Sequence, residues 1–193
     1  MKKGDTIIEV ILAFSVFSAA MMGGLWLMNN AMARAQASLQ LTMARNAMDG
    51  QAESLRYLNS LNLARQSVGV SLPEWSNIPI RSTPSALNFC PQNISEINGF
   101  VVNMANMTIL RNTAGNNNRL RPADTYPRLE YNVADTNDIS GGDIVGSRGL
   151  WIEAVRANNS DNFIDFHIRA CWNAPGQNAP TTLGTIVRLY NAN

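Results

Sequence analysis

The sequence predicts an α+β fold in which one long N-terminal helix packs on a small antiparallel β-sheet. Residues 6–66 contain no proline and are apolar or rich in good helix formers, which predicts one continuous helix. The C-terminal half instead contains short segments of alternating apolar and polar residues, separated by turn-forming residues. At 193 residues, the chain has room for this helix and one modest domain.

We expect residues 5–28 to form the membrane-spanning half of the helix. From residue 6 onward this range is apolar or small except for Glu9, and about 20 such residues span a bilayer. Lys2 and Lys3 precede it, so the positive-inside rule places the N-terminus in the cytoplasm and the rest of the chain outside. A charge in the hydrocarbon core costs roughly 2.5 to 3.5 kcal/mol on insertion scales. Glu9 therefore needs a specific partner or a function.

A secretory signal peptide is the alternative, because Ser18-Ala19-Ala20 resembles a small-residue cleavage site. Two features oppose it. Asp5 and Glu9 place carboxylates at the start of the apolar stretch, and the apolar pattern continues past residue 20 to Met28. Glu9 has a further interpretation. Because it is only one turn inside the helix, its side chain could extend toward the lipid headgroups instead of pairing with another group.

Residues 29–66 are predicted to continue the helix outside the membrane. A helix of about 60 residues would be about 90 Å long, far more than a bilayer requires, so its outer half must be a structural spine. Gly50 and the Gly23-Gly24 pair are weak points, which either permit close helix packing or allow a segment to stretch during assembly. Four apolar residues recur at spacings of four, three and three and predict a face for a domain to pack on: Met48, Ala52, Leu55 and Leu58.

The start of the chain resembles a known processing signal. Residues 3–10, KGDTIIEV, are similar to the class III signal of type IV pilins and type II secretion pseudopilins, in which a basic leader ends in glycine before a long hydrophobic helix. The resemblance implies that residues 1–4 are a leader peptide. It implies that prepilin peptidase cuts between Gly4 and Asp5 and methylates the new amino group of Asp5. It also implies a pilin-like fold and a structural subunit that polymerises through its helix and ends in an extracytoplasmic pilus or pseudopilus.

Filament assembly gives Glu9 a partner. When apolar helices bundle, a buried carboxylate can pair with the N-terminal ammonium of a neighbouring subunit, and each charge offsets the desolvation of the other. A misregistered subunit would leave both charges unpaired, at a cost of several kcal/mol. Asp5 departs from the family pattern, which has phenylalanine or another apolar residue there, and its carboxylate could compete with Glu9. Asp5 and the asparagine-rich head favour a minor subunit over a major one.

The composition shifts to Gly, Pro, Ser and Asn in residues 67–84, which we interpret as a linker to a β-rich head of residues 85–193. Leu150–Arg156 and Phe163–Ala170 flank a turn and predict an antiparallel hairpin. The strands expected in the head are Gly99–Asn103, Leu150–Arg156, Phe163–Ala170 and Thr185–Tyr190.

The two cysteines, Cys90 and Cys171, are far apart and lack the spacing of a zinc site. If the head is exported, a single long-range disulfide is expected, which would tie the segment that enters the head to the sheet edge. Two free thiols in a reducing compartment are the alternative.

The sequence offers little for catalysis. His167 is the only histidine and lies in a predicted strand, where a structural role is favoured over that of a catalytic base. There is no serine nucleophile elbow, phosphate-binding glycine loop or HExxH motif. We therefore expect no enzyme and no cofactor. A membrane-anchored binding protein or adhesin that never polymerises is the alternative function, and a tethered enzyme comes third.

One loop has the oxygen ligands that calcium prefers, but its spacing does not match an EF-hand. Runs of asparagine, aspartate and glycine more often form turns, so this metal site is only a weak candidate. Its residues would be Asp135, Asn137, Asp138 and Asp143.

A second loop, residues 116–118, is surrounded by four arginines that could touch DNA phosphates if the filament takes up DNA. The net charge of +1 gives no overall attraction to nucleic acid, and a solvated basic loop is the favoured interpretation. The four residues are Arg111, Arg119, Arg121 and Arg128.

Overall fold

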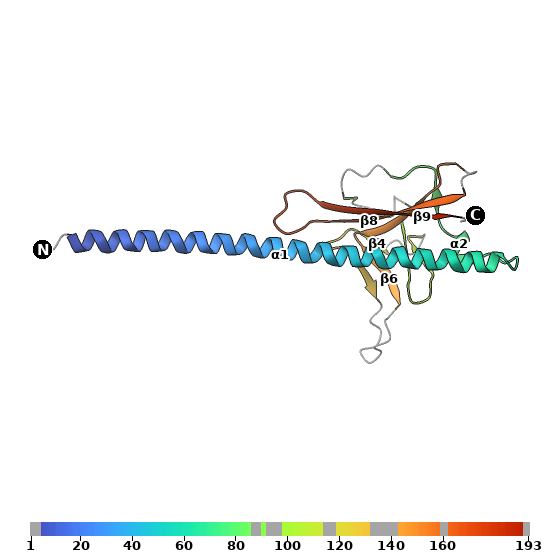
Figure 1. Ribbon diagram of the computed structural model, residues 1–193, viewed down its shortest axis with the longest axis horizontal. Coiled ribbons are helices and arrows are strands. Elements are labelled where there is room, and N and C mark those ends of the chain that lie inside the picture. Colours follow the sequence, from blue (N-terminus) through green and yellow to red (C-terminus); the bar gives the residue numbers. More distant parts are fainter. Residues whose placement is uncertain are drawn as a thin grey trace, which may run out of the picture.

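A single helix, α1, defines the long axis of the molecule (Figure 1). In this computed structural model, α1 runs from Asp5 to Gln66, a length of 62 residues. Its first half extends away from the rest of the molecule, and its second half lies against the β-rich head (Figure 1). This is the predicted α+β architecture. The structure describes residues 5–85, 90–91, 98–113, 119–131, 143–158 and 162–190.

After α1 the chain forms a short helix, α2 (Pro73–Ser76), and then a series of strands. In chain order these are β1 (Ile80–Arg81), β2 (Phe100–Val102), β3 (Ile109–Arg111), β4 (Leu120–Arg121), β5 (Arg128–Tyr131), β6 (Ile144–Arg148), β7 (Leu150–Val155), β8 (Phe163–Trp172) and β9 (Thr181–Tyr190).

The main sheet has the order β3-β2-β7-β8-β9, and each pair of neighbours is antiparallel. β1 adds to it as a parallel neighbour of β7. The expected hairpin is confirmed, because β7 and β8 pair from Leu150↔Ala170 to Val155↔Asp165. The last strand begins at Thr181 rather than Thr185, since β9 pairs with β8 along its whole length of ten residues.

A second, three-stranded sheet with the order β4-β6-β5 was not predicted. Its strands have two to five residues, too few for an alternating pattern to show. Gly146 permits the pairing of β4 with β6, because a Cβ atom at this position would lie 2.4 Å from the backbone oxygen of Arg119.

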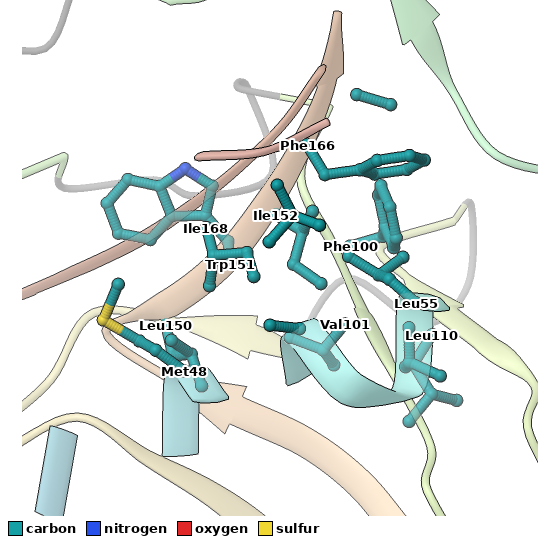
Figure 2. Packing of buried hydrophobic residues seen from close by; sticks show 14 of the residues in the cluster. Met48, Leu55, Phe100, Val101, Leu110, Leu150, Trp151, Ile152, Phe166 and Ile168 are labelled. Carbon is teal, nitrogen blue, oxygen red and sulfur yellow. The ribbon is translucent and has the colours of Figure 1, made fainter. Parts of the chain in front are cut away.

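The core lies between the second half of α1 and one face of the main sheet. All four residues of the predicted stripe, Met48, Ala52, Leu55 and Leu58, are buried. Side chains of β2, β7 and β8 face them, among them Phe100, Ile152 and Phe166 (Figure 2). Gly50 does not interrupt α1, and a Cβ there would lie 3.4 Å from the sulfur of Met104. The surroundings of Gly50 therefore agree with close packing.

Residues 67–84 do more than link the helix to the head. The ring of Trp75 in α2 is buried and lies 5.8 Å, centroid to centroid, from the ring of Phe166. β1 extends the main sheet through Ile80↔Ala154 and Arg81↔Val155. The range that the composition marks as a linker thus contributes to both core and sheet.

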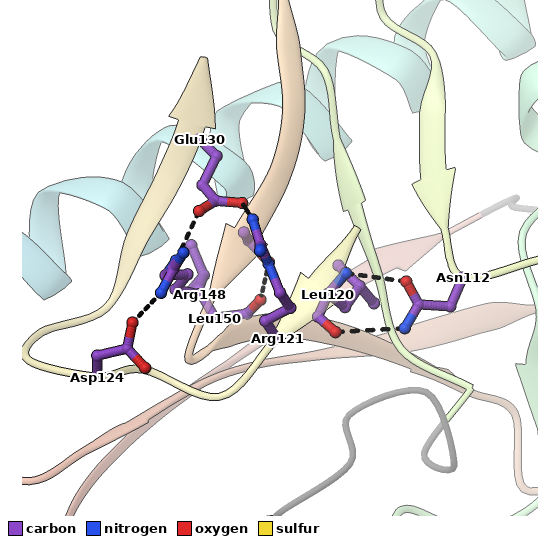
Figure 3. A network of polar contacts seen from close by, with 8 residues as sticks. Asn112, Leu120, Arg121, Asp124, Glu130, Arg148 and Leu150 are labelled. Carbon is purple, nitrogen blue, oxygen red and sulfur yellow. Dashed lines mark hydrogen bonds and ion pairs between the residues drawn. The ribbon is translucent and has the colours of Figure 1, made fainter. Parts of the chain in front are cut away.

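Two side-chain amides make the pair of backbone hydrogen bonds that a neighbouring strand would otherwise make. Gln51, fully buried on α1, donates from Nε2 to the backbone oxygen of Val102 at 2.9 Å and accepts from its N–H at 2.7 Å. Asn112 makes the same pair of contacts with the backbone of Leu120, at 3.3 and 2.9 Å (Figure 3). Each amide satisfies one backbone donor and one backbone acceptor, which would be costly to leave unpaired in the interior.

The predicted disulfide is present. Cys90 and Cys171 are bonded, with their Cα atoms 5.5 Å apart. Its position differs from the expectation in one respect: Cys171 lies on β8, which has β7 on one side and β9 on the other, so the bridge reaches an inner strand and not the sheet edge.

Candidate functional site

The first half of α1 presents an apolar surface that no described part of the chain covers. None of the most apolar 18-residue window is buried, and the helix is long and apolar enough to cross a membrane. Phe14 is 71% exposed and Trp26 is 68% exposed. Because soluble monomers rarely expose large continuous apolar patches, this surface requires lipid, other apolar helices or both.

The head begins to cover α1 near Ala33. In the turn after β8, a Cβ atom on Gly176 would lie 3.4 Å from the Cβ of Ala33. Farther along, the indole N–H of Trp172 donates to Oε1 of Gln40 at 3.1 Å. The helix thus has a bare part of roughly residues 5–32 and a part that serves as the spine of the head (Figure 1).

Glu9 lies on the bare part, one turn after the start of α1, and its side chain is exposed. Its neighbours Ile8 and Val10 are 67% and 66% exposed. No described residue of the chain forms a hydrogen bond or an ion pair with it. The carboxylate thus has its partner, if any, outside the described part of this chain. Gly4 lies outside the described residues, as does the side chain of Asp5, so cleavage and methylation stay predictions.

A second notable carboxylate, Glu153, was missed in the sequence. It is fully buried on β7, on the sheet face opposite the helix, because successive strand residues point to opposite faces. Its Oε1 accepts from the indole N–H of Trp151 at 3.0 Å, and its Oε2 accepts from the backbone N–H of Ser85 at 2.8 Å. A glutamate inside the apolar run Leu150–Val155 was the available signal. Its contacts hold the chain near residue 85 against the sheet.

His167 lies opposite Glu153 in the pairing of β7 with β8, within the sheet as expected. Burial lowers the pKa of His167, and the charge of Arg169 acts in the same direction, while the carboxylates of Asp165 and Glu153 oppose them. The unfolded chain, with a histidine pKa of about 6.5, therefore binds the proton more readily than the folded chain.

The pKa shift of His167 predicts a pH-dependent stability. The contribution of neutral His167 to the free energy of unfolding is fully present above about pH 6.5. It is lost as the pH falls through the lowered pKa of His167 in the folded state. His167→Gln should flatten this decline between about pH 7 and 5. Urea unfolding of wild type and variant across that range measures it. The pKa of Asp165 is also lowered, chiefly by its hydrogen bond from Arg188, but that group titrates below this window. Equal slopes for the two proteins would contradict the prediction.

The calcium candidates are only partly described. Asp135, Asn137 and Asp138 lie outside the described residues, and Asp143 is exposed just before β6. Within the described ranges, no group of three or more His, Cys, Asp or Glu side chains is close enough to hold a metal ion.

The arginines proposed for DNA contact are largely engaged within the head. Arg121 donates to Glu130 at 2.6 Å, and Arg148 donates to the other oxygen of that carboxylate at 2.6 Å and also to Asp124 (Figure 3). The guanidinium of Arg128 lies over the ring of Tyr126. These contacts join β4, β5 and β6, whereas Arg111 is exposed at the end of β3.

No family model matches the chain, and neither a curated protein nor a solved structure is similar enough to count as a match. The features of the chain that point to a function are therefore its own residues, above all the bare part of α1 and Glu9.

Proposed function

We propose that this protein is a structural, non-catalytic subunit, of the minor kind, of a type IV pilus or a type II secretion pseudopilus. One observation carries the proposal: Glu9 is the only charged residue in residues 6–32, on the bare, apolar part of a 62-residue helix whose other part is the spine of a β-rich head. A lipid environment alone penalises such a charge. A bundle of identical or related helices can offer it a cation.

The cation is the N-terminal ammonium of a neighbouring subunit, formed when prepilin peptidase removes residues 1–4. Pairing with Glu9 fixes the axial register of adjacent helices, since any other register leaves two buried charges unpaired. In this proposal the subunit first sits in the cytoplasmic membrane with its N-terminus inside. It then passes into the extracytoplasmic filament with other pilin or pseudopilin subunits as partners.

The intact mass of the protein isolated from membranes tests the processing step. Loss of residues 1–4 together with the gain of one methyl group is expected. An intact Met1 would instead favour a membrane-anchored binding protein or adhesin that never polymerises. Cleavage near Ala20 would favour a secretory signal peptide, and either result would overturn the proposal.

Glu9→Ala should be cleaved and methylated normally but enter filaments poorly. Without the carboxylate, the ammonium of the neighbouring subunit stays unpaired, and a cost of several kcal/mol corresponds to a loss of incorporation of at least about tenfold. Sheared filaments, quantified against the membrane fraction, give the measurement. Glu53→Ala is the matched control, because Glu53 is an exposed glutamate on the spine part of the same helix. Equal incorporation of wild type and the Glu9 variant would argue against the pairing mechanism.

A further inference from the structure

The edge strand β9 lies on the head, away from the bare part of α1. Among the described residues it pairs only with β8, so its other edge carries unpaired backbone N–H and C=O groups. Gly184, Thr185 and Ile186 are consecutive exposed residues in its centre, and Ile186 is 59% exposed. Proteins usually protect such edges with proline, lysine or a bulge. β9 contains neither residue, and its pairing with β8 has no register shift.

A pocket lies on each side of β9 at Gly184. The outer pocket has a volume of about 330 Å³, and Trp151, His167, Arg169 and Ile186 contribute to its walls. The helix-side pocket has a volume of about 240 Å³ and lies between Leu183–Thr185 and the α1 residues Arg45, Met48 and Asp49. Side chains of an extended strand alternate between the two faces. A strand added beside β9 would therefore direct successive side chains toward the two pockets.

Arg169 gives the outer pocket its charge preference. It is the direct partner of Gly184 in the pairing of β8 with β9, so no β9 side chain covers its flank. Its nearest carboxylate in the described chain is Glu153, with Nε and Oε1 4.0 Å apart. Both oxygens of Glu153 already accept shorter hydrogen bonds, from Trp151 and Ser85. A carboxylate that reaches across Gly184 would give Arg169 a charge-assisted partner.

We propose that β9 binds, by strand addition, an extended segment of a partner protein that places an acidic side chain opposite Gly184. The backbone of the segment would complete the open edge, and its acidic side chain would enter the outer pocket toward Arg169. A second copy of β9 fits poorly, because residues 181–190 contain no acidic residue. The binding needs no filament, so it stands apart from the role proposed for Glu9.

The test uses the full-length protein in detergent and two labelled peptides of alternating threonine and valine, with a central glutamate or a central glutamine. Fluorescence anisotropy should show the glutamate peptide binding about tenfold more tightly than the glutamine peptide. Hydrogen exchange should show new protection of β9 amides on binding. Equal affinities, no binding of either peptide, or protection elsewhere would overturn the proposal. Self-association through β9 without peptide would identify a second copy as the occupant and overturn it too.

Variants separate the pocket from the rest of the strand. Arg169→Gln should abolish the preference for the glutamate peptide and leave binding of the glutamine peptide unchanged. Gly184→Val should weaken the binding of both peptides at least about tenfold, because the valine side chain would occupy the outer pocket. The fold should accept valine at residue 184, since the nearest atom to a Cβ added there is the backbone oxygen of Ile168 at 3.8 Å. The Tm of each variant checks that the fold is kept.

Arg188→Gln is the matched control for Arg169→Gln, because it removes a cation from the neighbouring strand β9, on the same face of the sheet but outside the pocket. It should keep the preference for the glutamate peptide. Glu9→Ala should bind both peptides as the wild type does, so failure of filament assembly and failure of peptide binding are separate results. Unchanged binding by Gly184→Val would show that the outer pocket is not used.

Discussion

Replacing Cys90 and Cys171 together with alanine should lower the free energy of unfolding by about 4 kcal/mol. The bridge closes a loop with a sequence separation of 81 residues, and the loss of chain entropy in the unfolded state grows with loop length. Its position adds to this effect. Cys171 is buried on β8, the strand that joins β7 to β9, so the bridge ties the chain near residue 90 to the middle of the main sheet.

Urea unfolding of the full-length protein in detergent, followed by tryptophan fluorescence, measures the change, because Trp75, Trp151 and Trp172 are all buried in the head. Wild type treated with a reductant during unfolding should have the same free energy of unfolding as the double alanine variant. This comparison separates the effect of losing the bond from the effect of losing the cysteine side chains. A difference from the oxidised wild type of less than about 1 kcal/mol would show that the folded head does not depend on the bridge.

The elements that the sequence predicted well are those whose own pattern is long enough to decide their structure. The absence of proline and the stripe of Met48, Ala52, Leu55 and Leu58 together determine one helix and the face that it buries. The hairpin of β7 and β8 is equally local, because two alternating segments flank one turn. In each case the pattern that indicates the structure lies within one continuous stretch of sequence.

The elements that were missed depend on contacts from elsewhere in the chain. β4 and β6 pair where Gly146 lets the backbone of Arg119 approach, and β1 forms only because β7 offers it an edge. Glu153 carried a sequence signal, but its partners Trp151 and Ser85 meet only in the folded sheet. Sequence patterns alone do not give such long-range juxtapositions.

The same distinction applies to the candidate sites. Glu9 stands out in the sequence because its surroundings are apolar, and the structure leaves it exposed on the bare part of α1. Its proposed partner belongs to a second subunit. The outer pocket beside β9 could not be predicted, because it forms only when the pairing of β8 with β9 places Gly184 directly opposite Arg169.

Gln51→Leu should destabilise the head by about 3 kcal/mol, although leucine is apolar, similar in size and about as good a helix former as glutamine. Among the described residues β2 pairs with β7 only at Phe100, so beyond that residue no described strand bonds the backbone of Val102 on the side away from β3. Gln51 fills that role with both ends of its amide. Leucine would leave a buried N–H and a buried C=O unpaired, at about 1 to 3 kcal/mol for each group that cannot reach water.

Two further variants make this test specific. Gln51→Glu keeps an acceptor for the Val102 N–H but sets a carboxylate oxygen against the Val102 carbonyl oxygen, so it should be at least as destabilising at neutral pH. Gln36→Leu makes the same change at an exposed position of the same helix and should alter stability by less than about 0.5 kcal/mol. Hydrogen exchange at the Val102 amide should accelerate in Gln51→Leu, which removes its acceptor, and stay unchanged in the Gln36 control. If Gln51→Leu cost no more than Gln36→Leu, the backbone of Val102 would have to find other partners, and the amide would not be what joins α1 to the sheet.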